Sequence, residues 1–110
     1  MLTRYQYLLT KLAEEASEIA QIALKTQQFG ADEVCPGQEH TNTERIHKEL
    51  IDLLAIVCML NEEFNFGFNY FNVIKEAAYK IEAKQNKVDK YYQYSQDCGM
   101  VEDNLDYDGE

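Results

Sequence analysis

A single acid interrupts an otherwise apolar segment of this chain. Residues 50–60 read LIDLLAIVCML, and Asp52 is the only charged residue among them. A segment that is apolar on every side is typical of a helix that is buried all round. An ionised carboxylate in such a helix is costly unless it is paired, hydrogen-bonded or bound to a metal ion. Lys48 lies four residues earlier, near the expected start of the helix. Because Lys48 is long and lies near the helix start, we expect the partner of Asp52 to come from elsewhere in the fold. A divalent cation would satisfy the carboxylate.

The hydrophobic pattern predicts an all-α fold. Between residues 4 and 28, apolar residues recur at intervals of three and four, which indicates an amphipathic helix. No glycine or proline interrupts this helix, and Gly30 marks its expected end. Nowhere is the alternation of polar and apolar residues long enough to predict a β-sheet.

Two further helices are expected after a loop over residues 30–43. Thr41 and Glu44 have the spacing of a capping box, which predicts a second helix that runs to about Glu63. A third helix is expected over residues 69–94, bent or split along its length. The chain therefore offers three helical segments for one bundle.

Two acidic strings lie in the first two predicted helices. Glu14, Glu15 and Glu18 form E-E-x-x-E, and Glu49 and Asp52 form E-x-x-D. A spacing of three residues places two acids one turn apart on the same side of a helix. If the helices pack antiparallel, the two pairs converge, and four crowded carboxylates repel each other strongly without a cation. The first string alone is more often a solvated helix face, and Asp52 alone could cap a neighbouring helix or meet an arginine or lysine in the fold. The conjunction of the two strings favours a site for Mg²⁺ or Mn²⁺.

Lysines follow a helical spacing in the third predicted helix. Lys80, Lys84 and Lys87 recur at i, i+4 and i+7 and make one basic stripe. An ordinary solvated face would explain this stripe equally well. Beside a metal–carboxylate centre, we interpret it as a clamp for phosphates, in which lysine acts as a point charge.

The charge distribution limits the classes of partner. The 110 residues carry a formal net charge of −10, and six of the 20 acids lie in residues 97–110, where no base occurs. We expect one domain, residues 1–96, followed by an acidic, flexible tail, residues 97–110. An acidic chain also lacks the basic face that binding of duplex nucleic acid requires.

Cysteine usage and the N-terminal sequence predict a cytoplasmic protein. Cys35, Cys58 and Cys98 form no C-x-x-C pair, which is typical of reduced thiols and not of a disulfide framework or a zinc site. Residues 1–15 contain a charge every few positions and no long apolar run, so neither a signal peptide nor a membrane span is expected.

The order of these features resembles the MazG-type nucleoside triphosphate pyrophosphohydrolases. This all-α superfamily includes dimeric dUTPases and dCTP pyrophosphatases. The segments KLAEEASEIAQ at residues 11–21 and KELIDLLAIVCMLNEEFNFG at residues 48–67 match its pattern, and the resemblance covers roughly residues 5–92. It implies a helical bundle of MazG-like type that is completed by oligomerisation, as a homodimer or a homotetramer.

The resemblance also implies roles for the acids. Glu15, Glu18, Glu49 and Asp52 would bind Mg²⁺, for which Mn²⁺ could substitute. Glu14 would help to position or activate the attacking water, which makes it a catalytic residue together with Glu15 and Glu18.

The substrate would be held by other residues. Lys80 and Lys87 match the family's phosphate-binding positions, whereas Lys84 stands where relatives often have Asn. Asn61, which follows the apolar segment, is a candidate for contact with the edge of the base.

The reaction implied by the resemblance is attack of water on the α-phosphorus of a (deoxy)nucleoside triphosphate. The products are a nucleoside monophosphate and pyrophosphate. A purine deoxynucleotide such as dGTP is the favoured substrate, and small relatives act in nucleotide-pool control, including in phages. One alternative is another pyrophosphate-bearing nucleotide, such as phosphoribosyl-ATP or a damaged dNTP. Another is a non-catalytic helical oligomerisation module whose acids serve the structure.

Overall fold

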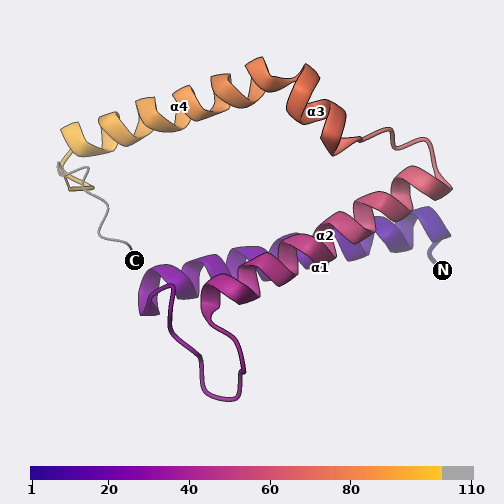
Figure 1. Ribbon diagram of the computed structural model, residues 1–110, viewed down its shortest axis with the longest axis horizontal. Coiled ribbons are helices and arrows are strands. Elements are labelled where there is room, and N and C mark those ends of the chain that lie inside the picture. Colours follow the sequence, from indigo (N-terminus) through magenta and orange to yellow (C-terminus); the bar gives the residue numbers. More distant parts are fainter. Residues whose placement is uncertain (103–110) are drawn as a thin grey trace. The chain divides into compact units, whose positions relative to one another are not determined.

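The chain forms helices and the turns that join them. The computed structural model describes residues 1–102, and no strand occurs among them, so the predicted all-α class is confirmed. The helices are α1 (Arg4–Phe29), α2 (Asn42–Glu63), α3 (Tyr70–Glu76) and α4 (Ala78–Asp97) (Figure 1). They divide into two compact units: residues 1–67 hold α1 and α2, and α3 and α4 follow from Phe68 onward.

Helix α1 begins and ends close to its predicted bounds. Thr3 caps its start: its hydroxyl accepts from the Gln6 backbone N–H at 3.1 Å, and its own N–H donates to the Gln6 side chain at 3.0 Å. Gly30 ends it with a φ of 100°, a conformation that side chains other than glycine rarely adopt. The capping signals are local, which is why the sequence predicts this helix well.

Helix α2 begins at the predicted capping box. The Thr41 hydroxyl accepts from the Glu44 N–H at 3.1 Å, and the Glu44 carboxylate accepts from the Thr41 N–H at 2.9 Å. Asn42, which follows Thr41, is fully buried. Its side-chain amide donates to the Gly30 carbonyl at 3.0 Å and to the Glu33 carboxylate at 3.1 Å. Asn42 thereby fixes the loop between the two helices.

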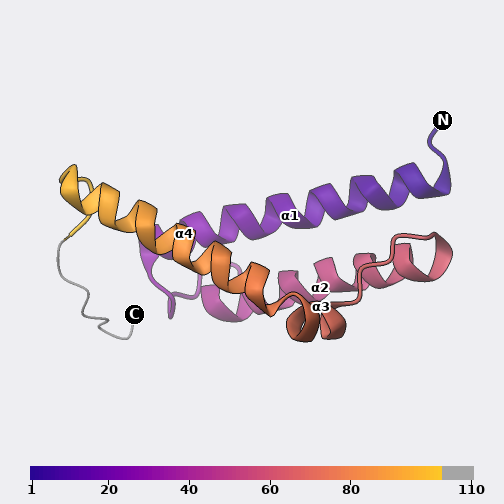
Figure 2. The ribbon, with the colours of Figure 1, turned by 90° about the horizontal axis from the view of Figure 1, so that it is seen from above.

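Helices α1 and α2 pack as an antiparallel hairpin (Figure 2). At its open end, the Arg4 guanidinium donates to both carboxylate oxygens of Glu63, at 2.8 and 3.0 Å. Tyr5 and Phe64 meet there edge to face, with ring centroids 4.9 Å apart. The most deeply buried apolar side chains of the seam are Leu8, Ile22 and Leu60. This packing sets the register in which the acids of α1 face those of α2.

The outer side of α2 is not buried in the hairpin. The side chains of Leu50 and Ile51 are 46% and 67% exposed, and Asp52 is only half-buried. The expectation that residues 50–60 are buried all round is therefore wrong for the hairpin taken by itself. Two helices cover only one side of each other, so an apolar outer face stays open until another element covers it.

The predicted third helix is split in two, as the sequence indicated. Asn69 caps α3 by accepting from the N–H groups of Phe71 and Asn72, at 3.1 and 3.3 Å. Ala77 has left the α-helical conformation, with φ −110° and ψ 22°, and separates α3 from α4. Helix α4 then continues to Asp97, three residues beyond the predicted end.

The residues after α4 fold back on its last turn. Gln96, which is buried, donates from its side chain to the Glu102 carbonyl at 2.7 Å. Most of the predicted acidic tail, residues 103–110, lies outside the described residues. Among the helices that are described, none is long and apolar enough to cross a membrane.

Candidate metal centre

Three carboxylates from two helices meet across the seam of the hairpin. Helix α1 contributes Glu15 and Glu18, one turn apart, and α2 contributes Glu49 from its middle. Each offers an oxygen within 4.8 Å of the other two. The i, i+3 spacing within α1 and the antiparallel packing therefore bring together three of the four acids that the sequence assigned to the metal.

Two oxygens of this cluster are buried without a partner. Glu15 Oε2 and Glu49 Oε2 are inaccessible to solvent and accept no hydrogen bond. The Glu49 side chain is only 13% exposed, whereas Glu15 is half-buried and Glu18 is exposed. An ionised oxygen that is removed from water needs a proton, a donor or a cation. Because all three groups are carboxylates, the donor set suits a hard divalent cation such as Mg²⁺ or Mn²⁺.

Repulsion within the cluster changes the proton affinity of Glu18. Its pKa is raised above the usual value, first by the hydrogen bond with the Glu49 carboxyl group, then by the charge of Glu49, and then by burial. A proton shared by two carboxylates needs no metal, and it removes one negative charge. A cation and a proton would compete for these oxygens, so metal binding is coupled to protonation of the cluster.

Asp52 does not join the cluster. Its Oδ2 accepts from the Lys48 ammonium at 2.9 Å, and its side chain is 39% exposed. The expectation that Asp52 needs a partner from elsewhere in the fold is therefore wrong, because Lys48, one turn earlier on α2, supplies it. The same ammonium lies 3.8 Å from Glu49 Oε1. Contact with Asp52 and Glu49 raises the pKa of Lys48.

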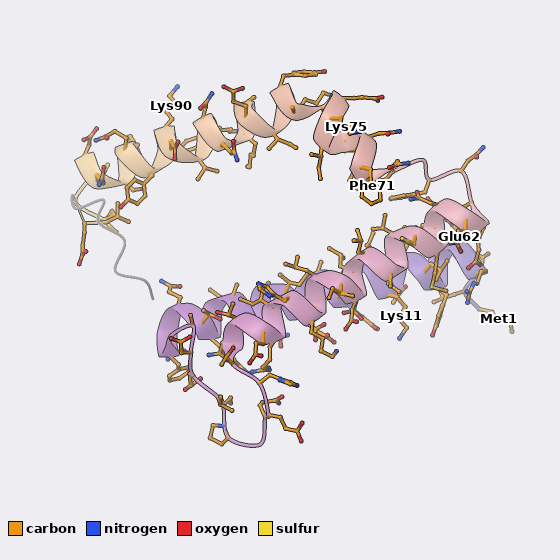
Figure 3. The ribbon with its side chains drawn as sticks, in the orientation of Figure 1. Met1, Lys11, Glu62, Phe71, Lys75 and Lys90 are labelled. Carbon is orange, nitrogen blue, oxygen red and sulfur yellow. The ribbon has the colours of Figure 1, made fainter. Side chains whose placement is uncertain are left out.

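Glu14 is not one of the three clustered carboxylates. It forms an ion pair with Lys11, 3.1 Å long and one turn earlier on α1, and its side chain is 52% exposed. Figure 3 labels Lys11, whose side chain projects from the hairpin. The charge of Glu14 contributes to the raised pKa of Glu18, which is its one evident link to the carboxylate cluster.

The remaining predicted residues lie away from the three carboxylates along the chain. Asn61 is half-buried on α2, twelve residues after Glu49, which is about 18 Å along a helix. Lys80, Lys84 and Lys87 are exposed on α4, in the second unit. Lys80 and Lys87 extend over the rings of neighbouring tyrosines, at 5.9 and 6.0 Å from the ring centroids.

Comparison of the chain with protein-family models, curated proteins and solved structures finds no match. The functional evidence is therefore the cluster itself: its three acids, their position on the two helices, and its two unpartnered oxygens.

The structure also contains a groove that the sequence did not indicate. It has a volume of about 410 Å³ and runs along α2 next to the start of that helix. Its lining residues are His40, Glu44, His47, Lys48, Ile51 and Asp52. The only sequence signal for this groove is the seven-residue spacing of His40 and His47. His40 lies before the start of α2, so helix periodicity does not predict the direction of its side chain.

Proposed function

We propose that this protein is a divalent-metal-dependent hydrolase that cleaves a (deoxy)nucleoside triphosphate at the α-phosphorus. The products would be a nucleoside monophosphate and pyrophosphate. The observation that supports this proposal is the three-carboxylate cluster, with Glu15 Oε2 and Glu49 Oε2 buried and unpartnered. The order of its acids along an antiparallel helical hairpin agrees with the resemblance to MazG-like pyrophosphohydrolases.

In this proposal, Glu15, Glu18 and Glu49 hold Mg²⁺, and Mn²⁺ can substitute. Three carboxylates leave room in an octahedral shell for water and for substrate phosphate oxygens. When bound, the ion would neutralise phosphate charge and favour ionisation of the attacking water. Asp52 would become a further ligand once it is released from Lys48, which holds it now.

The other acid and the lysine stripe would act on the reactants. Glu14 orients the attacking water through a hydrogen bond once it leaves Lys11. The new bond joins the water oxygen to the α-phosphorus, the bond from that phosphorus to the bridging oxygen breaks, and the water proton passes to a carboxylate. Lys80, Lys84 and Lys87 neutralise the charge of the triphosphate and of the leaving pyrophosphate.

We further propose that two or four copies of the chain assemble, which would complete a helical bundle in the cytoplasm. Each unit, taken by itself, leaves large apolar side chains uncovered. Among them are Leu50, Ile51, Ile74 and Val88, with exposed fractions between 46% and 67%. Such apolar surface is typical of a subunit interface.

The substrate that fits the proposal best is a purine deoxynucleotide such as dGTP, with a role in nucleotide-pool control of a cell or a phage. Phosphoribosyl-ATP and damaged dNTPs share the same pyrophosphate group and are alternative substrates. A non-catalytic oligomerisation module is the second candidate. It is favoured by the ion pairs Lys11–Glu14 and Lys48–Asp52, which give two of the acids a structural partner without any metal.

The test is release of pyrophosphate from the eight common NTPs and dNTPs, with Mg²⁺ and with EDTA. We expect metal-dependent release with at least one nucleotide, and a loss of about 100-fold or more in Glu49→Gln, as for removal of a group that stabilises transition-state charge. The matched control is Glu62→Gln, because Glu62 is an exposed acid near the end of the same helix (Figure 3). Equal rates in Glu49→Gln and Glu62→Gln would contradict the site, and no release from any nucleotide would favour the non-catalytic module.

A further inference from the structure

Lys48 contacts both the carboxylate cluster and the acid outside it. Its ammonium lies 2.9 Å from Asp52 Oδ2 and 3.8 Å from Glu49 Oε1. The side chain is 66% exposed, so solvent can compete for the ammonium group. Lys48 is therefore a cation of the chain itself, placed at the edge of a cluster of acids.

This internal cation does not satisfy the cluster. Glu15 Oε2 and Glu49 Oε2 remain buried and unpartnered although Lys48 is present. The ammonium approaches the other oxygen of Glu49, and its closest contact is with Asp52, which lies outside the cluster. A divalent ion among Glu15, Glu18 and Glu49 would thus find Asp52 occupied and a positive charge next to one of its ligands.

We propose that Lys48 is a positioning residue that sets the divalent-ion affinity of the cluster by holding Asp52 apart and by opposing the charge of the incoming ion. This inference rests on the proposed function, because it assumes that the cluster binds the ion. Two effects of removing the lysine charge would both raise the affinity of the cluster for the ion. Repulsion of the ion disappears, and Asp52 becomes free to turn towards the cluster.

A third effect would lower the affinity for the ion, and the choice of pH keeps it small. The charge of Lys48 lowers the pKa of Glu18, although other causes raise it more. Without Lys48, the proton on Glu18 competes better with the metal near that pKa. The measurement is made at pH 8 because the protonated fraction of a carboxyl group falls as the pH rises, which weakens this competition.

The experiment is calorimetric titration of the chelator-treated, full-length protein with Mn²⁺ at pH 8. We expect Lys48→Gln to bind Mn²⁺ about tenfold more tightly than the natural sequence, as for removal of a unit charge near a divalent ion in a water-like surrounding. Lys48→Arg, which keeps the charge, is expected to stay close to the natural affinity. Arg4→Gln is the matched control, because it removes an equal charge and an ion pair at the far end of the hairpin.

A double variant separates the two effects of Lys48. If release of Asp52 contributes, Lys48→Gln with Asp52→Asn loses part of the gain seen in Lys48→Gln alone. An affinity in Lys48→Gln that equals or falls below that of the natural sequence would overturn the role of Lys48, while the metal centre would stand. Absence of saturable Mn²⁺ binding in every folded variant would overturn the proposed centre and this inference together.

Discussion

At the scale of single residues, Glu18 and Glu49 decide how the cluster behaves without metal. The nearby Glu49 carboxyl group raises the pKa of Glu18, first through hydrogen bonding and then through its charge. The contact is favourable only while one of the two is protonated. Two ionised carboxylates at this spacing repel each other, and a divalent ion would relieve the repulsion.

Replacement of Glu18 by glutamine is expected to stabilise the metal-free protein at pH 8. Because the pKa of Glu18 is raised on folding, its contribution to stability is fully present below the unfolded value of 4.5 and is lost as the pH rises through the folded value. The thermal midpoint of Glu18→Gln should thus exceed that of the natural sequence at pH 8, and the difference should shrink towards pH 4. Thermal denaturation in EDTA across this range measures both.

Addition of Mg²⁺ supplies the control for this prediction. The ion should raise the midpoint of the natural sequence more than that of Glu18→Gln, since the variant has lost one ligand. A variant that is less stable than the natural sequence at pH 8 in EDTA would contradict repulsion at Glu18.

Single residues also show where sequence reasoning reached its limit. The spacing of Glu15, Glu18 and Glu49 predicted their convergence, because helix periodicity and antiparallel packing suffice to place them. The pairing of Asp52 with Lys48 does not follow from the sequence, because Lys48 lies near the start of the helix and its long side chain can reach several positions. Whether an i, i+4 pair forms depends on exposure, and exposure follows from the neighbouring helices, which the sequence of one element does not contain.

At the scale of elements, capping made the helix bounds predictable and tertiary packing made the burial unpredictable. Capping signals within a few residues of Thr3, Gly30 and Thr41 mark the helix ends, so local sequence predicts them. The outer face of α2 is different. Its apolar residues indicate that something covers it, yet the hairpin leaves Ile51 67% exposed.

Replacement of Ile51 by glutamate is expected to weaken the assembly of chains and leave the helices intact. A charge on an apolar face opposes its burial against another subunit, whereas the exposed position within the hairpin tolerates it. Ile51→Leu keeps the apolar surface and is the matched control. Light scattering during gel filtration measures the mass, and far-ultraviolet circular dichroism measures the helix content.

The predicted result is a lower mass for Ile51→Glu, with unchanged helix content, and the same oligomer for Ile51→Leu and the natural sequence. A natural sequence that stays a single chain at all concentrations would contradict the proposed assembly. An unchanged oligomer in Ile51→Glu would remove this face of α2 from the interface.

At the scale of the whole molecule, the two units contain different groups of charged residues. The α1–α2 hairpin contains all three clustered acids and Asp52, and the unit with α3 and α4 contains the lysine stripe. Figure 3 labels Lys75 on α3 and Lys90 on α4, and both belong to the five basic residues of positions 75–90. The three clustered acids and the lysine stripe thus lie in different units, which agrees with separate roles for metal and phosphate. The sequence predicted this separation, but amino-acid spacing does not determine how many copies of each unit form one site.

The most direct test of the central claim is a titration of the metal-free protein with Mn²⁺, followed by the electron paramagnetic resonance signal of the free ion. We predict saturable binding by the natural sequence and by Glu62→Gln, and a loss of affinity of about tenfold or more in Glu49→Gln, because Glu49 provides a buried ligand oxygen. Equal binding by Glu49→Gln and Glu62→Gln would contradict a metal centre at the three carboxylates.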